Sequence, residues 1–164
     1  MTPTLYFLRS SENKIVTDML KYAHPDIENP QIYSQFYGLT SKDLGLYALV
    51  ENKIAGAIWS RQLKVEDGAK AFIDEKTPVV SFTVLPEFRK QGIGKAMMQQ
   101  FLLEAATLYD SLTISLSSQK KKREFYEQFG FEMYEKDKTI LIKRLQRQEI
   151  IRPTDGYDSS KWMD

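Results

Sequence analysis

Two glycines separated by one residue follow an apolar stretch near the middle of the chain. The stretch 79–85 is typical of a strand, and Gly92 and Gly94 lie between it and a segment with helical spacing. Glycine lets the backbone approach a ligand closely, and the start of a helix presents N–H groups without intrahelical partners. Taken alone, these residues leave two interpretations open. One is a phosphate site, and the other is a tight turn that needs glycine only for its geometry.

Two common phosphate motifs do not fit this turn. A Walker A loop needs Gly-Lys followed by Ser or Thr, and here an alanine follows Gly94-Lys95. A dinucleotide-binding fingerprint needs a third glycine three residues after the second, and Met97 stands there. The pattern that remains is Arg89-x-x-Gly92-x-Gly94 at a junction between a strand and a helix.

Composition limits the other kinds of chemistry. The chain has 164 residues, a net charge of +1 and no cysteine. A charge near zero gives no bulk attraction to nucleic acid or to a membrane surface, so we expect neither partner. The absence of cysteine excludes disulfides, thiolate metal sites and cysteine nucleophiles. The only histidine, His24, precedes Pro25 and is interpreted as a loop or cap residue rather than a ligand, so no metal is expected.

The spacing of apolar residues predicts one α+β domain. Strands are expected at 4–8, 46–51, 54–61, 79–84, 112–116, 131–134 and 139–143, and helices from Ser10 or Ser11 to 22 and at 31–38, 93–109 and 121–129. Residues 62–77 are expected to be a loop. Antiparallel hairpins and one helical crossover occur together, which predicts a mixed sheet. The domain is assigned to residues 1–145, and residues 146–164 form a polar C-terminal extension. The lack of a long apolar run or signal peptide favours a cytoplasmic protein.

Three segments occur in a recognisable order. They are Val84-x-Pro86-Glu87-x-Arg89-x-x-Gly92-x-Gly94, the strand Leu112 to Leu116, and Glu124-Phe-Tyr-Glu-Gln-Phe-Gly-Phe131. Together they resemble the GNAT superfamily of acyl-CoA-dependent N-acetyltransferases, and the resemblance covers residues 46–143. It implies a single-domain, mostly antiparallel mixed sheet flanked by helices, with splayed central strands. It also implies transfer of an acetyl group from acetyl-CoA to a primary amine.

The resemblance implies a set of residues that bind the cosubstrate acetyl-CoA. In this family, the backbone of the strand before the turn pairs with the pantetheine arm, a role that falls on Phe82, Thr83 and Val84. The turn and the first helical residues would hold the pyrophosphate, and they are Arg89, Lys90, Gln91, Gly92, Ile93, Gly94 and Lys95. Gln119 stands where many members carry an asparagine that contacts the cofactor, and Lys122 stands where a small residue is usual.

The same resemblance assigns Tyr126 as the general acid that protonates the leaving thiolate. The alternative is a core aromatic residue with its hydroxyl satisfied. Many members place an acidic base at the start of the strand before the turn, where this chain has Thr77-Pro78. Asp74 and Glu75 lie just upstream and are the base candidates. The basic run 120–123 is either an exposed charged surface or a dock for the nucleotide phosphates, and a nucleic-acid patch ranks last.

The acceptor of the acetyl group is the part of the predicted reaction that the sequence determines least. Residues 18–43 and 61–77 are expected to shape its cleft, and their acidic and aromatic side chains suit a cationic amine. A small amine, a peptide N-terminus and a protein lysine all remain open. Direct attack is favoured because no cysteine can carry the acyl group. The alternative function is a non-catalytic acyl-CoA-binding module. A homodimer formed through Ile150, Ile151 and Trp162 is a further hypothesis.

Overall fold

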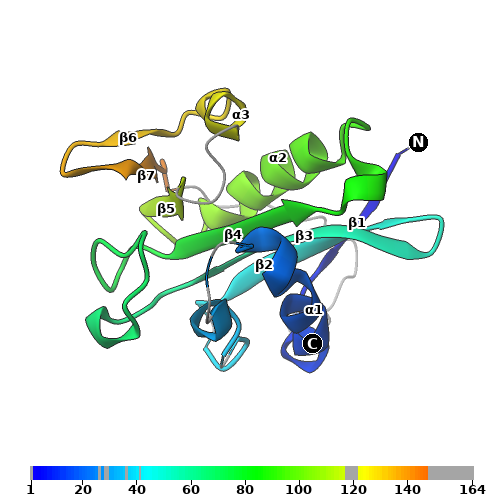
Figure 1. Ribbon diagram of the computed structural model, residues 1–164, viewed down its shortest axis with the longest axis horizontal. Coiled ribbons are helices and arrows are strands. Elements are labelled where there is room, and N and C mark those ends of the chain that lie inside the picture. Colours follow the sequence, from blue (N-terminus) through cyan, green and yellow to red (C-terminus); the bar gives the residue numbers. More distant parts are fainter. Residues whose placement is uncertain are drawn as a thin grey trace, which may run out of the picture.

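Seven strands form one continuous sheet in the computed structural model of the protein (Figure 1). The structure describes residues 2–25, 27, 30–35, 37–40, 42–116 and 122–147. In chain order the strands are β1 (Thr4–Phe7), β2 (Leu44–Val50), β3 (Lys53–Arg61), β4 (Val79–Val84), β5 (Ser111–Ser115), β6 (Glu132–Tyr134) and β7 (Asp137–Arg144). They lie in the order β1-β2-β3-β4-β5-β7-β6, and only β4 and β5 are parallel. The predicted mixed, mostly antiparallel α+β sheet is therefore confirmed.

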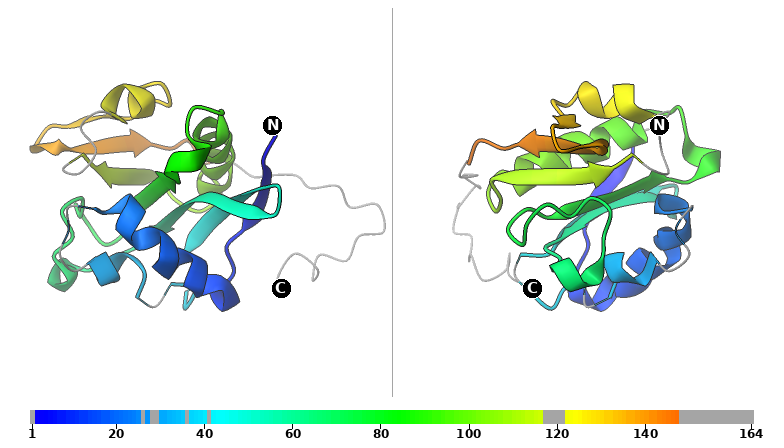
Figure 2. Two further views of the ribbon diagram at one scale, coloured as in Figure 1. Left: turned by 45° about the vertical axis from the view of Figure 1, so that its right-hand side comes forward. Right: turned by 60° about the vertical axis from the view of Figure 1, so that its left-hand side comes forward.

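Within the described residues, three α-helices cover the sheet. They are α1 (Asn13–Ala23), α2 (Ile93–Ala105) and α3 (Arg123–Glu127). Figure 2 shows α1 on one face of the sheet and α2 and α3 on the other. Each face has its own core of buried side chains: Val16 of α1 and Trp59 belong to one core, and Phe101 of α2 and Phe82 belong to the other. The sheet thus separates two hydrophobic cores.

Strand β4 is buried on both faces. Successive side chains of a strand point to opposite faces, and the two cores divide β4 accordingly. Val80 and Phe82 belong to the core under α2 and α3, whereas Val79 belongs to the core under α1. By the same alternation, Ser81 and Thr83 face the α1 side.

The central strands β4 and β5 separate after a single point of contact. Their register consists of one pair, Val79↔Thr113, at the start of β4. On its other edge β4 pairs with β3 along its whole length, from Val79 to Val84. The edge of β4 that faces β5 is therefore open beyond Val79, which confirms the expected splay.

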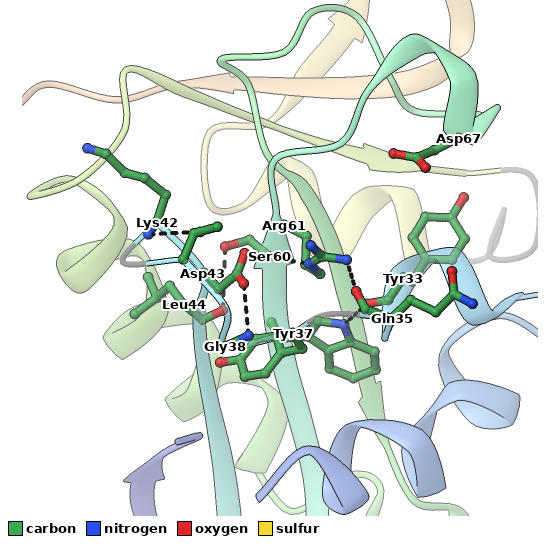
Figure 3. A network of polar contacts seen from close by, with 12 residues as sticks. Tyr33, Gln35, Tyr37, Gly38, Lys42, Asp43, Leu44, Ser60, Arg61 and Asp67 are labelled. Carbon is green, nitrogen blue, oxygen red and sulfur yellow. Dashed lines mark hydrogen bonds and ion pairs between the residues drawn. The ribbon is translucent and has the colours of Figure 1, made fainter. Parts of the chain in front are cut away.

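The segment 31–38, predicted to be a helix ended by Gly38, folds differently. Its described residues contain a 3-10 turn at Pro30–Tyr33 followed by irregular turns, and Gly38 has a left-handed φ of 88°. Contacts with distant residues hold this segment, because the Asp43 carboxylate accepts a hydrogen bond from the Gly38 N–H at 2.8 Å (Figure 3). Tertiary contacts outweigh the weak helix propensity of this short stretch.

An arginine at the end of β3 ties the same segment to the sheet. The Arg61 Nε lies 3.5 Å from Asp43 Oδ1, an ion-pair contact without hydrogen-bond geometry, and the Arg61 Nη1 donates to the Gln35 carbonyl oxygen (Figure 3). The side chains of Arg61 and Asp43 are only 12% and 3% exposed. The pair is therefore largely removed from water.

Other element boundaries differ from the prediction by a few residues. Helix α2 ends at Ala105 instead of 109, because the Thr107 hydroxyl donates to the Glu104 carbonyl oxygen at 2.7 Å and competes with the helical bonds. The first helix begins at Asn13 after a 3-10 turn, and α3 spans 123–127 instead of 121–129. Residues 62–77 contain a 3-10 turn at Val65–Asp67.

Residues 148–164 lie outside the described residues. They include most of the predicted C-terminal extension and the residues of the homodimer hypothesis, Ile150, Ile151 and Trp162.

Among the helices of the described chain, none combines the length and apolar character needed to cross a bilayer.

We expect Asp43→Ala to lower the free energy of unfolding by about 3 kcal/mol, because it leaves Arg61 buried without a counter-charge. Urea unfolding at pH 7 measures the change. Glu127→Ala is the matched control, since it removes the exposed Arg123–Glu127 pair, and it should cost less than about 1 kcal/mol. Equal costs for the two variants would contradict a structural role of the buried pair.

Candidate functional site

The turn between β4 and α2 has an unusual backbone. Lys90 and Gly92 both adopt left-handed conformations, with φ of 62° and 79°. Gly92 is the N-cap residue of α2, and the first helical hydrogen bond runs from the Ala96 N–H to the Gly92 carbonyl at 3.1 Å. The N–H groups of the residues before Ala96 in the first turn therefore have no intrahelical acceptor. They form the positive end of the helix dipole, which favours an anion.

A cavity of about 310 Å³ lies at this turn. It is lined by Phe82, Val84, Phe88, Arg89, Lys90, Gly92, Ile93, Gly94, Lys95, Lys122 and Phe125. The missing side chain of Gly94 helps to keep it open, since a Cβ there would lie 3.1 Å from the Phe82 Cζ and 3.3 Å from the Val84 Cγ2. Residues from β4, the turn, α2 and the start of α3 thus meet around one space.

Most of the residues predicted to bind the cofactor line this cavity. Thr83 and Gln91 do not, because Thr83 faces the α1 side and the exposed Gln91 donates from Nε2 to the Glu87 carbonyl at 3.4 Å. Gln119 lies outside the described residues. Sequence reasoning missed Phe88 and Phe125 as lining residues. The Phe125 ring stacks on the Phe82 ring, with 5.6 Å between the ring centres. The apolar spacing within α3 does not reveal this contact with β4.

The cavity has a cationic rim. Four of its lining side chains are basic, and none of its described lining residues is acidic. The Lys122 ammonium lies 5.5 Å from the centre of the Phe82 ring. Burial lowers the pKa of Lys122, and the nearby Arg89 lowers it further. Arg89 is anchored through its Nε, which donates to the Val84 carbonyl at 3.0 Å. This rim attracts a polyanion.

Tyr126 lies behind the apolar wall of the cavity. Its ring is fully buried and packs edge-on against three other rings. The distances between ring centres are 6.2 Å to Phe82, 5.6 Å to Phe125 and 5.8 Å to Phe131. Burial raises the pKa of the Tyr126 phenol, so it stays protonated at neutral pH. The residue is therefore a core aromatic in its packing, and a potential proton donor in its ionisation state.

The two base candidates lie away from this cavity. Asp74 and Glu75 are exposed and are not among the lining residues. The Asp74 Oδ1 accepts hydrogen bonds from the N–H groups of Lys76 at 2.9 Å and Thr77 at 2.8 Å. This carboxylate fixes the turn before β4, and its catalytic role stays a prediction.

His24 is the residue whose setting the sequence reasoning did not foresee. It is a cap residue, as expected, because its N–H donates to the Leu20 carbonyl at the end of α1. Its side chain, however, is buried, with Nε2 at 2.8 Å from the Ser81 Oγ and the ring stacked on Tyr33 at 3.9 Å. Burial lowers the pKa of His24 to about 4. The available signal was spacing, since His24 follows the buried Val16 and Leu20 at intervals of four.

The described residues contain no group of three or more His, Asp or Glu side chains placed to hold a metal ion.

Comparison with known proteins identifies relatives of the chain. The family model described as acetyltransferase (GNAT) domain matches residues 21–140. The fold resembles the ribosomal-protein-S18-alanine N-acetyltransferase of Escherichia coli, with a TM-score of 0.63, 13% identity, and 90% and 97% of the two chains covered. It also resembles a GNAT superfamily phosphinothricin acetyltransferase of Sinorhizobium meliloti in complex with AcCoA, with a TM-score of 0.63, 16% identity and 95% of each chain covered. No curated protein matches the sequence significantly.

The lowered pKa of His24 predicts a loss of stability in acid. As pH falls below 6.5, unfolded chains bind a proton at this ring before folded ones do, so the stabilisation present above pH 6.5 is lost toward pH 4. Between pH 7 and pH 5 the wild type should lose about 2 kcal/mol more than His24→Gln, which does not titrate there. Urea unfolding of both proteins at the two pH values tests this. Equal losses would show that the ring is accessible to protons in the folded state.

Proposed function

Because this chain belongs to the GNAT acetyltransferase family, we propose that it transfers the acetyl group of acetyl-CoA to a primary amine. The family assignment makes it an acyltransferase, and the amine specificity and direct attack are the finer proposals. The observation that carries them is the cavity at the β4–α2 turn, where a helix N-terminus and four basic side chains face one space.

The residues around this cavity fit coenzyme A. The N–H groups at the start of α2 and the side chains of Lys90 and Lys95 suit its diphosphate. The open edge of β4 beyond Val79 offers backbone groups to an extended amide chain such as pantetheine. The space left by Gly94 beside Phe82 and Val84 gives such a chain room to pass.

The chemistry poses two proton problems. A free alkylammonium has a pKa near 10.4, so making it neutral at pH 7 costs about 4–5 kcal/mol. The leaving thiolate needs a proton, and we assign this to Tyr126, whose buried phenol is protonated at neutral pH. The absence of cysteine supports direct attack within a complex of both substrates, because the chain has no thiol to carry the acetyl group.

The acceptor is proposed only as a class. A small molecule or a peptide or protein with a free amine fits, and segments 18–43 and 61–77 are the proposed cleft. The alternative, a non-catalytic acyl-CoA-binding module, draws support from the distance of Asp74 and Glu75 from the cavity lining.

One pair of assays separates the two functions. Calorimetry with coenzyme A measures binding. Release of free thiol from acetyl-CoA is then followed with benzylamine, spermidine, lysine, a peptide with an N-terminal alanine, and a lysine peptide blocked at its N-terminus. Binding with thiol release supports the transferase, binding without release on any amine favours the module, and absence of binding contradicts both.

Lys95→Gln should weaken coenzyme A binding by about fivefold, because one cation is removed from the rim of the cavity. The matched control is Lys14→Gln, an exposed lysine of α1 on the other face of the sheet. Calorimetry at low and high salt measures both, and the difference should shrink as salt screens the charge. Equal affinities for the two variants would remove Lys95 from the site.

Tyr126→Phe should lower kcat by about 100-fold and change coenzyme A affinity little, because only the proton donor is lost. Tyr109→Phe is the control: its hydroxyl is also buried, but it donates to the Lys42 carbonyl and lies outside the cavity lining. Steady-state kinetics and calorimetry separate the two effects. An unchanged kcat in Tyr126→Phe would remove this residue as the acid.

A further inference from the structure

A second, much smaller cavity lies between β4 and β5 at the narrow end of their separation. Its volume is about 10 Å³, close to the size of one water or one amine nitrogen. Its lining includes His24 and Ser81 on the α1 side and Ile114 and Ser115 of β5. Polar groups from α1 and two strands thus meet where the open edge of β4 begins.

The hydrogen bond between His24 and Ser81 is the defining contact of this cavity. The Nε2–Oγ distance is 2.8 Å, and the two residues are only 6% and 2% exposed. The imidazole is held flat against Tyr33, with 12° between the rings. Tyr33 is held in turn, because the Trp59 indole N–H donates to its carbonyl at 2.7 Å. A base that is aimed at a hydroxyl and fixed by a further group is the arrangement found in activated hydroxyl sites.

Phe82 connects this cavity to the cofactor cavity, because it lines both of them. Ser81 precedes it on β4 and points to the opposite face. Tyr126 packs against the Phe82 side, and His24 contacts the Ser81 side. An acyl group held along the open edge of β4 would therefore have a phenol on one side and the serine–histidine pair on the other.

A structural role for the His24–Ser81 hydrogen bond does not explain every polar group on this face of β4. Thr83, two residues beyond Ser81, points to the same side, and its buried hydroxyl has no hydrogen-bond partner in the structure. An unsatisfied buried hydroxyl costs about 1–3 kcal/mol. Two hydroxyls in line on this face of β4, one of them without a hydrogen-bond partner, favour a polar occupant beside the strand.

We propose that Ser81 and His24 form a proton relay that receives the proton of the acceptor amine. This inference rests on the proposed function and names its proton acceptor. Ser81 is the catalytic residue, since its Oγ would meet the amine. His24 is the positioning residue, which orients the Ser81 hydroxyl and takes its proton.

With this relay, every proton and every bond of the reaction is accounted for. The acceptor ammonium first gives one proton to solvent. As the neutral nitrogen then bonds to the acetyl carbon, a second N–H bond breaks and its proton passes to the Ser81 Oγ. The Ser81 proton moves to the His24 Nε2, which becomes an imidazolium. The C–S bond breaks, and the thiolate takes the Tyr126 proton. Return of the His24 proton to solvent and of a solvent proton to Tyr126 resets the site.

The surroundings keep His24 in the neutral form that a proton acceptor needs. Strands β4 and β5 bring no titratable side chain to the ring, the segment 30–33 brings Tyr33, and Lys21 of α1 is exposed and lies over the Tyr22 ring. Desolvation therefore dominates, and with a pKa of about 4 the ring is neutral at physiological pH. Negative charge that develops on the departing sulfur would favour the imidazolium.

The test uses the full-length protein with acetyl-CoA and the amines named above. Ser81→Ala and His24→Gln should each lower kcat by about 100-fold at pH 7, with coenzyme A affinity within about twofold of wild type. Their rates should recover in part at high pH, because hydroxide then removes the N–H proton that the relay no longer accepts. Ser60→Ala, which removes another buried strand serine, should keep the wild-type rate. Variants that are unchanged, or slowed equally at every pH, would overturn the relay.

A second measurement does not depend on the stability of the variants. His24 is the only histidine, so its ring signals in the NMR spectrum need no assignment by mutation. Adding coenzyme A to the wild type should shift these signals and change the apparent pKa. Unchanged signals, with binding shown by calorimetry, would overturn the inference. Absence of thiol release by the wild type itself would instead overturn the proposed function, and the relay with it.

Discussion

The parting of β4 from β5 after one parallel pair is the constraint on which the rest of the site depends. Buried backbone N–H and C=O groups are nearly always paired, yet among the described residues the β5-facing edge of β4 has no strand partner beyond Val79. Both faces of β4 are nevertheless buried. A strand that is enclosed on its faces and open along one edge is prepared to bind another extended chain.

The opposite edge of β4 shows how firmly this strand is held. Gly56 of β3 pairs with Val84, and a Cβ at this glycine would lie 2.4 Å from the Thr83 carbonyl oxygen. Because the two backbones approach each other this closely, no side chain fits between β3 and β4 at Gly56. Two separate cores fix the faces, so the open edge keeps its place without support from β5. The turn and α2 continue directly from this rigid strand, which places the groups proposed to bind the phosphates at its end.

Local patterns predicted most of the fold, and long-range contacts account for what they missed. Alternation and glycine punctuation were enough for the hairpin, β4, the turn and α2. The burial of His24 depends on Ser81, which lies 57 positions further along the chain. The prediction of a helix at 31–38 was wrong for the same reason, because contacts that involve Asp43 and Arg61 outweigh the local preference of this segment. The family resemblance predicted which turn would bind the cofactor, and the acidic candidates near Thr77 lie in an exposed turn.

Burial acts in opposite directions on the two ionisable groups that flank β4. Removal from water disfavours charge, so it raises the pKa of the Tyr126 phenol and lowers that of the His24 imidazole. Both groups are therefore neutral at physiological pH. A single strand with two buried faces can thus separate a group proposed as an acid from a group proposed as a base. In such a site the acceptor amine would be deprotonated as it reacts, and the solvent-exposed carboxylates before β4 would be needed only to shape the turn.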